Sequence, residues 1–313
     1  MKKHFLLYAK GMAMGAADVV PGVSGGTIAF ISGIYDELLR SIASVPEAAL
    51  LLLLRGRIKD AWRMANATFL LVLLGGILTS VLSFARLITY LLEHQPIPVW
   101  SFFFGLILVS AYMVGRDIHR WNWSRALSFL LGLAFAYWIT VAAPVQWGSD
   151  PLSLFCAGAI AICAMILPGI SGSFILLLLG LYPVVLGAVK DLEIGVLAVF
   201  AGGCLVGILS FARLLSWLLA RWRDLSLAFL TGLMLGSLNK VWPWKETLSW
   251  RVDSKGEQIP LLQNNLLPGH FAELSGQDPQ LLLALVLALA GIVLVLGLEW
   301  LAGRQPRDTG CAK

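Results

Sequence analysis

The chain has 313 residues, of which 58% are hydrophobic and only 13% are charged. Soluble domains carry about 25% charged residues, so this composition, with its long apolar runs, excludes an ordinary soluble protein and predicts a polytopic membrane protein. The net charge of +5 does not indicate nucleic-acid binding, because the basic residues gather beside apolar segments, where they orient a membrane protein.

The first predicted element is a helical hairpin over residues 5–35. Residues 5–20 have a helical pattern that covers only about 24 Å, which is shorter than the hydrocarbon core of about 30 Å. Pro21-Gly22-Val23-Ser24-Gly25-Gly26 then interrupts the helix, and a second short helix follows from Thr27. Such a break predicts a re-entrant hairpin, because irregular backbone at membrane depth must be satisfied by protein or water.

The remaining elements follow in chain order. Residues 41–63 predict an interfacial helix and a basic loop. Full spans are expected at 67–92, 98–115 and 124–143. A second re-entrant hairpin is expected at 152–190, broken at Pro168-Gly169, and further spans at 195–219, 225–240 and 280–302. Residues 241–279 read as a polar outer loop.

The second half of the chain repeats the first. Pro168-Gly169-Ile170-Ser171-Gly172-Ser173 repeats the first break at an offset of 147 residues, and Ser210-Phe211-Ala212-Arg213-Leu214 repeats Ser83-Phe84-Ala85-Arg86-Leu87 at an offset of 127. The first half therefore carries 20 extra residues (147 − 127), which the basic interfacial segment supplies. Two repeats are predicted, 1–143 and 152–302, each a hairpin followed by three spans.

The distribution of basic residues predicts the topology. With the N-terminus in the cytoplasm, 16 of the 23 lysines and arginines lie inside, five lie outside, and Arg86 and Arg213 lie in the membrane. Because each half has an odd number of spans, the second hairpin enters from the opposite side. The fold class is thus an all-α polytopic membrane protein of two inverted-topology repeats with both termini cytoplasmic, an architecture typical of secondary transporters.

The two breaks are candidate anion sites. Each starts a helix whose free N–H groups and positive dipole end point at the break, and small residues let a ligand approach. The alternative is tight turning, with the serines only capping helices. The candidate substrate-binding residues here are Pro21, Gly22, Ser24, Gly25, Gly26, Thr27, Pro168, Gly169, Ser171, Gly172 and Ser173.

Three charged residues lie in apolar surroundings. Arg86 and Arg213 are candidate substrate-binding residues, because an arginine in a membrane helix is costly and its planar fork suits phosphate oxygens; the alternative is snorkelling to the interface. Asp18 lies next to the first break, where Met165 holds the matching place in the second. Asp18 is a candidate for proton or sodium coupling, or else it caps the backbone or pairs an arginine.

Catalytic and metal-binding patterns are missing from the sequence. The four cysteines and four histidines show no metal-ligand spacing, and there is no Gly-x-Ser-x-Gly or Walker loop. We therefore expect no metal, no cofactor and no enzymatic activity, although distant residues can converge in a fold.

Gly11-x-x-x-Gly15-Ala16-Ala17-Asp18-Val19-Val20-Pro21-Gly22-Val23-Ser24-Gly25-Gly26-Thr27, with the later Pro168-Gly169-Ile170-Ser171-Gly172, resembles the PopT-type polyprenyl-phosphate transporter family over nearly the whole chain. The resemblance implies a bacterial cytoplasmic-membrane protein that returns undecaprenyl phosphate, the carrier lipid of wall and surface-glycan synthesis, to the cytoplasmic leaflet. By analogy with unrelated DedA-type transporters, re-entrant helices and arginines would hold the lipid phosphate.

The expected function is therefore translocation of a polyprenyl phosphate, with the lipid and the bilayer as partners. Two other classes stay open. A small-anion transporter or channel would need an enclosed aqueous path, whereas a lipid flippase needs a lateral opening. A membrane enzyme on lipid phosphates would need a nucleophile or metal cluster near the breaks.

Overall fold

The computed structural model describes residues 2–20, 22–252 and 258–303; the predictions for Pro21, Lys255 and the C-terminal tail lie outside the described residues. Within that range four helices are long and apolar enough to cross a membrane: α5 (Ala67–His94), α6 (Pro96–Arg116), α7 (Trp123–Val141) and α11 (Ile194–Arg221). A bent pair, α9 (Gly172–Leu178) and α10 (Tyr182–Lys190), could supply a fifth span. The chain is a mostly helical, multi-pass membrane protein.

The predicted spans 225–240 and 280–302 correspond to α12 (Arg223–Ser237) and α14 (Leu281–Gly303). With 15 residues, α12 is about 22 Å long, shorter than the hydrocarbon core. The chain after Ser237 turns instead of continuing as helix, and the predicted span was too long at this end.

Local sequence signals fix several helix starts. Asn122 caps α7 by accepting a hydrogen bond from the Arg125 N–H at 3.0 Å, and Asp150 caps α8 (Pro151–Ile166) by accepting one from the Ser153 N–H at 3.1 Å. Side-chain oxygens at these positions satisfy N–H groups that have no partner within the helix. The proline that opens α6 and α8 supplies the helical φ.

The two halves share helix pairings and close glycine contacts. The helix before each break packs against the first long helix after it, α1 (Lys2–Asp18) on α5 and α8 on α11, while α6 packs on α14 and α7 on α12. A Cβ added to Gly11 would collide with the Leu73 carbonyl, and one added to Gly158 would collide with the Phe200 carbonyl. These pairs are related by the offsets of 147 and 127, so the same backbone-to-backbone packing occurs twice.

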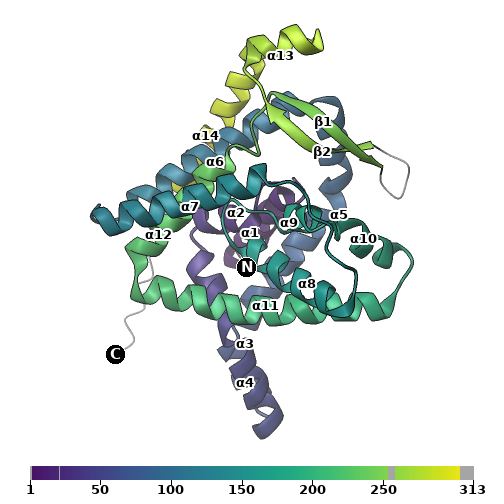
Figure 1. Cartoon of the computed structure of the whole chain (residues 1–313). Helices are drawn as coiled ribbons and strands as arrows, with labels where there is room; N and C mark the ends of the chain where they lie inside the picture. Colours follow the sequence, from purple (N-terminus) through teal and green to yellow (C-terminus); the bar gives the residue numbers. More distant parts are fainter. Residues whose placement is uncertain (1, 21, 253–257, 304–313) are drawn as a thin grey trace.

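Residues 41–63, predicted as an interfacial helix and a basic loop, form a projection of two helices. Helix α3 (Tyr35–Arg55) ends at Gly56, whose φ is +62°, and α4 (Ile58–Met64) folds back so that Ser44 Oγ donates to the Met64 carbonyl at 2.9 Å. Figure 1 shows α3 and α4 extending from one end of the molecule. Exposed leucines lie beside basic residues on this projection, as is typical of segments at the membrane interface. The interfacial location of the projection stays a prediction.

The predicted polar loop 241–279 contains regular structure. Strands β1 (Lys245–Val252) and β2 (Gln258–Asn265) form an antiparallel pair, followed by α13 (Pro268–Ser275). The all-α prediction is wrong for this segment, because alternating residues such as Thr247-Leu248-Ser249 favour strand pairing. The strand pair and α13 lie at the end of the molecule opposite α3–α4 (Figure 1).

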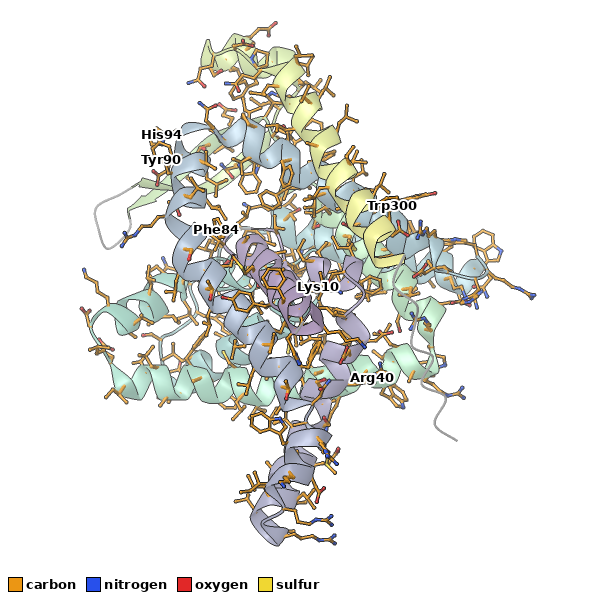
Figure 2. The ribbon with its side chains drawn as sticks, turned by 180° about the vertical axis from the view of Figure 1, so that it is seen from behind. Lys10, Arg40, Phe84, Tyr90, His94 and Trp300 are labelled. Atoms are coloured by element: carbon orange, nitrogen blue, oxygen red, sulfur yellow. The ribbon has the colours of Figure 1, made fainter. Side chains whose placement is uncertain are left out.

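Figure 2 shows the opposite face, where α1 crosses the middle of the molecule beside α5. Lys10 on α1 donates from Nζ to the Ser32 carbonyl at 2.7 Å, and so holds the turn between α2 (Gly25–Ile31) and α3. Further along α5, Tyr90 and His94 stack with ring centroids 4.1 Å apart (Figure 2).

Candidate functional site

The first helix break, residues 19–24, lies between α1 and α2. Gly22 turns the chain with φ of +91°, a conformation that costs glycine little. Ser24 Oγ caps α2 by accepting a hydrogen bond from the Gly26 N–H at 3.1 Å. Asp18 Oδ1 accepts a second from the Gly25 N–H at 2.7 Å. The first break therefore places its own carboxylate over the free N–H groups of α2, and Asp18 caps the backbone.

The second break, residues 167–171, lies between α8 and α9 and contains the buried Pro168. Gly169 has φ of +90°, almost the same value as Gly22. The hydroxyls of Ser171 and Ser173 are hydrogen-bonded to each other at 2.8 Å, and Ser171 makes no side-chain cap. Met165 replaces the aspartate of the first break, so the N-terminus of α9 has no carboxylate of its own chain half.

The two breaks lie against each other. Thr27 Oγ1 accepts a hydrogen bond from the Gly169 N–H at 3.1 Å, and Ser24 Oγ donates to the Met165 carbonyl at 2.9 Å. A Cβ added to Gly26 would collide with the Ile166 carbonyl oxygen. Side chains at the first break and the start of α2 thus satisfy backbone groups at the second break.

Neither arginine joins this contact. Arg213 on α11 donates from Nε to the Ala43 carbonyl at 3.1 Å and pairs with Glu47 at 2.6 Å, both on α3. Arg86 on α5 is exposed, and no described residue of either break accepts a hydrogen bond from it. The structure therefore brings together the glycine and serine part of the predicted site and not the arginines.

Lys240, in the turn after α12, lies beside the breaks instead, and Lys245 of β1 is bonded to it. The stem of Lys240 covers Gly22, since a Cβ added to Gly22 would lie 2.8 Å from Lys240 Cγ, and its Nζ lies 4.5 Å from the centroid of the Phe174 ring. Lys245 Nζ donates to the Lys240 carbonyl at 2.6 Å and lies 3.8 Å from the centroid of the Trp100 ring. Cation–π contact of this kind favours the charged ammonium.

Burial works against these charges. It lowers the pKa of Lys240 to about 8. Burial, together with the nearby Lys240 charge, holds the pKa of Lys245 well below its usual range. A desolvated ammonium without a counter-ion loses its proton more easily, so an anion placed beside either lysine would be bound and would restore the charge.

Two cavities adjoin the lysines. A small one of about 10 Å³ lies where Gly22, Gly169, Ser171 and Lys240 meet. A larger one of about 270 Å³ lies between α7, α9 and the strand pair, and both Lys240 and Lys245 line it. Thr140, Phe174 and Lys240 border both cavities and so connect the breaks with the larger cavity.

A family model described as VCA0040-like, undecaprenyl phosphate translocase-like, matches residues 14–259. That range contains both breaks, both lysines and both arginines. The chain belongs to this undecaprenyl phosphate translocase-like family.

Two curated relatives are similar over most of their length. A polyprenyl-phosphate transporter of Vibrio cholerae serotype O1 is 58% identical over 292 residues, covering 93% of this chain and 95% of the relative. A polyprenyl-phosphate transporter of Staphylococcus aureus is 31% identical over 252 residues, covering 75% of this chain and 84% of the relative. No solved structure matches the chain.

Sequence reasoning missed the two lysines of this translocase-like chain. Lys240 and Lys245 stand in a loop that carries other charges, and orientation rules give little weight to long loops. One signal could have found them: they flank Val241-Trp242-Pro243-Trp244. Lysines within an aromatic and proline-containing run are more apt to fold against the membrane domain than lysines of a solvated loop.

Proposed function

We propose that this chain translocates a polyprenyl phosphate, undecaprenyl phosphate, across the bacterial cytoplasmic membrane. The lipid would be returned from the outer to the cytoplasmic leaflet for reuse in wall and surface-glycan synthesis. The membrane domain and the family membership support a transporter, and the relatives are named polyprenyl-phosphate transporters.

One observation carries the proposal for the site: the breaks of the two chain halves meet at buried hydroxyls and glycine backbone. Two half-helices that end on one buried point form a site that both halves can reshape when they move. In this proposal the phosphate head group is bound by residues of the second break, including Ser171, Gly172 and Ser173, because Asp18 already occupies the N–H groups of the first.

The transport cycle follows from the proposed inverted repeats. One half would rock against the other around the meeting point of the breaks, exposing it to each side in turn, while the prenyl tail stays in lipid. Arg86, exposed and in apolar sequence, would attract the head group towards the membrane domain. Proton or sodium coupling through Asp18 would have to act on the cap that Asp18 forms with Gly25.

The test measures undecaprenyl phosphate exposed at the cell surface, using a membrane-impermeant reagent for the phosphate, in cells where this chain is the sole carrier of that lipid. Removing the chain should raise surface exposure, and restoring it should lower the exposure again. Gly26→Val should fail to restore it at normal protein level, because the added side chain meets the Ile166 carbonyl. Gly269→Val, at a position with open space in α13, is the matched control.

Unchanged surface exposure after removal of the chain would contradict the proposal. Arg86→Ala and Arg213→Ala should also be compared. We expect a loss of transport for Arg86→Ala, because Arg86 is the exposed charge in this proposal, and a smaller effect for Arg213→Ala, whose guanidinium is paired with Glu47.

A small-anion transporter is the second candidate, and the lysine-lined cavity favours it, because a free anion would fit there. Proteoliposomes that contain the purified chain distinguish the two. Uptake of inorganic phosphate would favour the small-anion transporter. Movement of a prenyl phosphate between leaflets without phosphate uptake would favour the lipid translocase.

A further inference from the structure

The cavity of about 270 Å³ between α7, α9 and the strand pair has walls of two kinds. Asn239, Gln263 and Asn265 give it an amide-rich side, and Tyr137, Val141 and Leu178 give it an apolar side. Part of this polar lining is held in place: Asn265 Nδ2 donates to the Asn239 carbonyl at 2.7 Å, and Asn239 Nδ2 donates to Thr140 Oγ1 at 2.8 Å.

The cavity carries positive charge with no negative charge beside it. Its described lining contains Lys240 and Lys245 and no aspartate or glutamate. Among the described residues no carboxylate pairs with either lysine, and no acceptor takes a hydrogen bond from Lys240 Nζ. Two buried ammonium groups that lack a counter-ion are costly unless a ligand supplies one.

We propose that this cavity is a phosphate-binding vestibule, in which Lys240 and Lys245 together bind a phosphate monoester or free phosphate before it reaches the helix breaks. The proposal rests on the proposed function only for the identity of the molecule that carries the phosphate group. The lysines, the amides and the cavity would bind the same chemistry in a lipid head group or in inorganic phosphate.

The size of the cavity favours a head group over a whole lipid. Clefts for drug-sized ligands measure about 300–1,000 Å³, so a cavity of about 270 Å³ holds a phosphate with surrounding water and is small for a whole prenyl lipid. Tyr137 and Val141 line the cavity and are also about half exposed on α7, at 51% and 49%. An attached prenyl chain could leave across this apolar edge of α7.

The vestibule is coupled to the breaks through Lys240. The same side chain that lines the cavity covers Gly22 of the first break and lies with its ammonium over Phe174, which follows the second break by three residues. A phosphate that draws Lys240 Nζ towards the cavity would therefore shift the groups that cover both breaks.

Binding to the purified full chain in detergent tests the vestibule, with inorganic phosphate and farnesyl phosphate as probes and farnesol as the probe without phosphate. We expect Lys240→Met and Lys245→Met each to weaken binding of both phosphates about tenfold or more. Lys240→Arg should retain most of the affinity. Lys190→Met, at an exposed lysine of α10, is the matched control and should bind as the unaltered chain does.

Phosphate binding at unaltered affinity in both methionine variants would overturn the inference. Because Lys245 also donates a hydrogen bond to the Lys240 carbonyl, thermal unfolding of each variant is measured as well. If Lys245→Met is unstable, the test rests on Lys240→Met, which removes no hydrogen bond of the described structure. Lysine-dependent binding of phosphate without any lipid transport would support the vestibule and contradict the proposed function. Lipid transport together with phosphate binding that does not depend on the lysines would support the proposed function and contradict the vestibule.

The pH profile adds a readout that a structural role of Lys240 would not change. Since the pKa of Lys240 is lowered to about 8, the affinity for farnesyl phosphate should fall as the pH rises from 7 to 9.5, because the ammonium is lost while a phosphate monoester, with a second pKa near 6, is already a dianion. Lys245 from β1 and Tyr137 from α7 are the other titratable groups of the described cavity lining, and Glu246, which follows Lys245 in β1, is outside that lining. The fall should be smaller in Lys240→Arg, and an identical profile in both would contradict the inference.

Discussion

Thr27 makes the hydrogen bond that most directly joins the two breaks, and its removal is a single-atom test of their contact. Thr27→Val keeps the shape of the side chain but leaves the buried Gly169 N–H without its acceptor. An unsatisfied buried donor costs about 1–3 kcal/mol. We expect Thr27→Val to lower the thermal unfolding temperature of the purified chain and to slow transport.

Thr27→Ser is the control, because serine retains the acceptor oxygen and loses only a methyl group. It should remain closer to the unaltered chain in both measurements. Equal stability of Thr27→Val and the unaltered chain would show that the Gly169 N–H finds another acceptor and that this bond does not hold the breaks together.

Asp18 can be tested in the same way, because one substitution can remove its charge and retain the oxygen that caps α2. Asp18→Asn retains an oxygen that can accept from the Gly25 N–H but cannot relay a proton. If the cap is the role of Asp18, this variant should fold and transport lipid. Asp18→Ala should be destabilised by about 0.5–2 kcal/mol. Transport is measured in proteoliposomes with and without a pH gradient.

A stable Asp18→Asn protein that no longer transports would contradict the cap as the sole role of Asp18. That result would favour coupling through the carboxylate. A transport rate that depends on the pH gradient in the unaltered chain and not in Asp18→Asn would point the same way.

At the residue scale the sequence predicted the breaks well and the charges poorly. Two copies of a Pro-Gly-x-Ser-Gly motif are a local signal, and the positive φ of Gly22 and Gly169 and the Ser24 cap follow from local chemistry. Where Arg213 points depends on Glu47, which is 166 residues away. Pairing of that kind depends on how whole helices pack, and no spacing in the sequence encodes it.

At the element scale, α3 links the two chain halves. Glu47 of α3 pairs with Arg213 of α11, and Asp36 of α3 pairs with Arg223 of α12 at 3.1 Å. These ion pairs involve α3, whereas the lysine-lined cavity adjoins the strand pair, which lies at the end of the molecule opposite α3 (Figure 1). We infer that the molecule is held closed at its α3 end in this conformation.

Removing both ion pairs should therefore favour opening of the α3 end. Exposed pairs contribute about 0.2–1 kcal/mol each, so Asp36→Asn with Glu47→Gln should shift the conformational equilibrium about 2- to 30-fold. The measurement is the rate at which a maleimide labels Asn264→Cys, an exposed position that lines the cavity. Labelling of Asn264→Cys should slow, because opening of the α3 end should close the end that contains the cavity.

The control is Asp60→Asn, which breaks the Arg57–Asp60 pair within α4 and its preceding residue and connects no two halves. It should leave the labelling rate unchanged. The same rate in the double variant and the unaltered chain would contradict a closing role for the α3 pairs.

Element predictions succeeded where the periodic pattern was long and apolar. The predicted span 67–92 became α5, and 195–219 became α11, each with its bounds within two residues. The strand pair was missed because its two segments are short, polar and joined across a turn, so their pairing contributes more to their structure than their own composition does. In the α3–α4 projection the helix was predicted, but its basic end, predicted as a loop, contains the further short helix α4.

At the scale of the whole molecule, the two halves repeat local geometry that no single helix requires. Gly22 and Gly169 share one φ value, as do Gly33 at +73° and Gly180 at +72°, at the offset of 147 in both cases. The helix pairings also map onto each other when the helices of the two halves are matched in chain order. An internal duplication explains these matches, and inversion of the halves in the membrane remains the prediction to be tested.

Cysteine labelling from one side of the membrane tests that inversion. Lys59→Cys lies in the exposed projection after the first break, and Glu193→Cys lies in the exposed turn after the second. If the halves are inverted, these turns face opposite sides. In intact cells an impermeant maleimide should label Glu193→Cys at once, and Lys59→Cys only after the membrane is opened, because the basic residues around Lys59 favour the cytoplasmic side. The unaltered chain, with its natural cysteines, sets the background. Labelling of both variants from the same side would mean that an even number of spans separates the two turns, and the rocking of inverted halves would then have to be abandoned in favour of a parallel repeat.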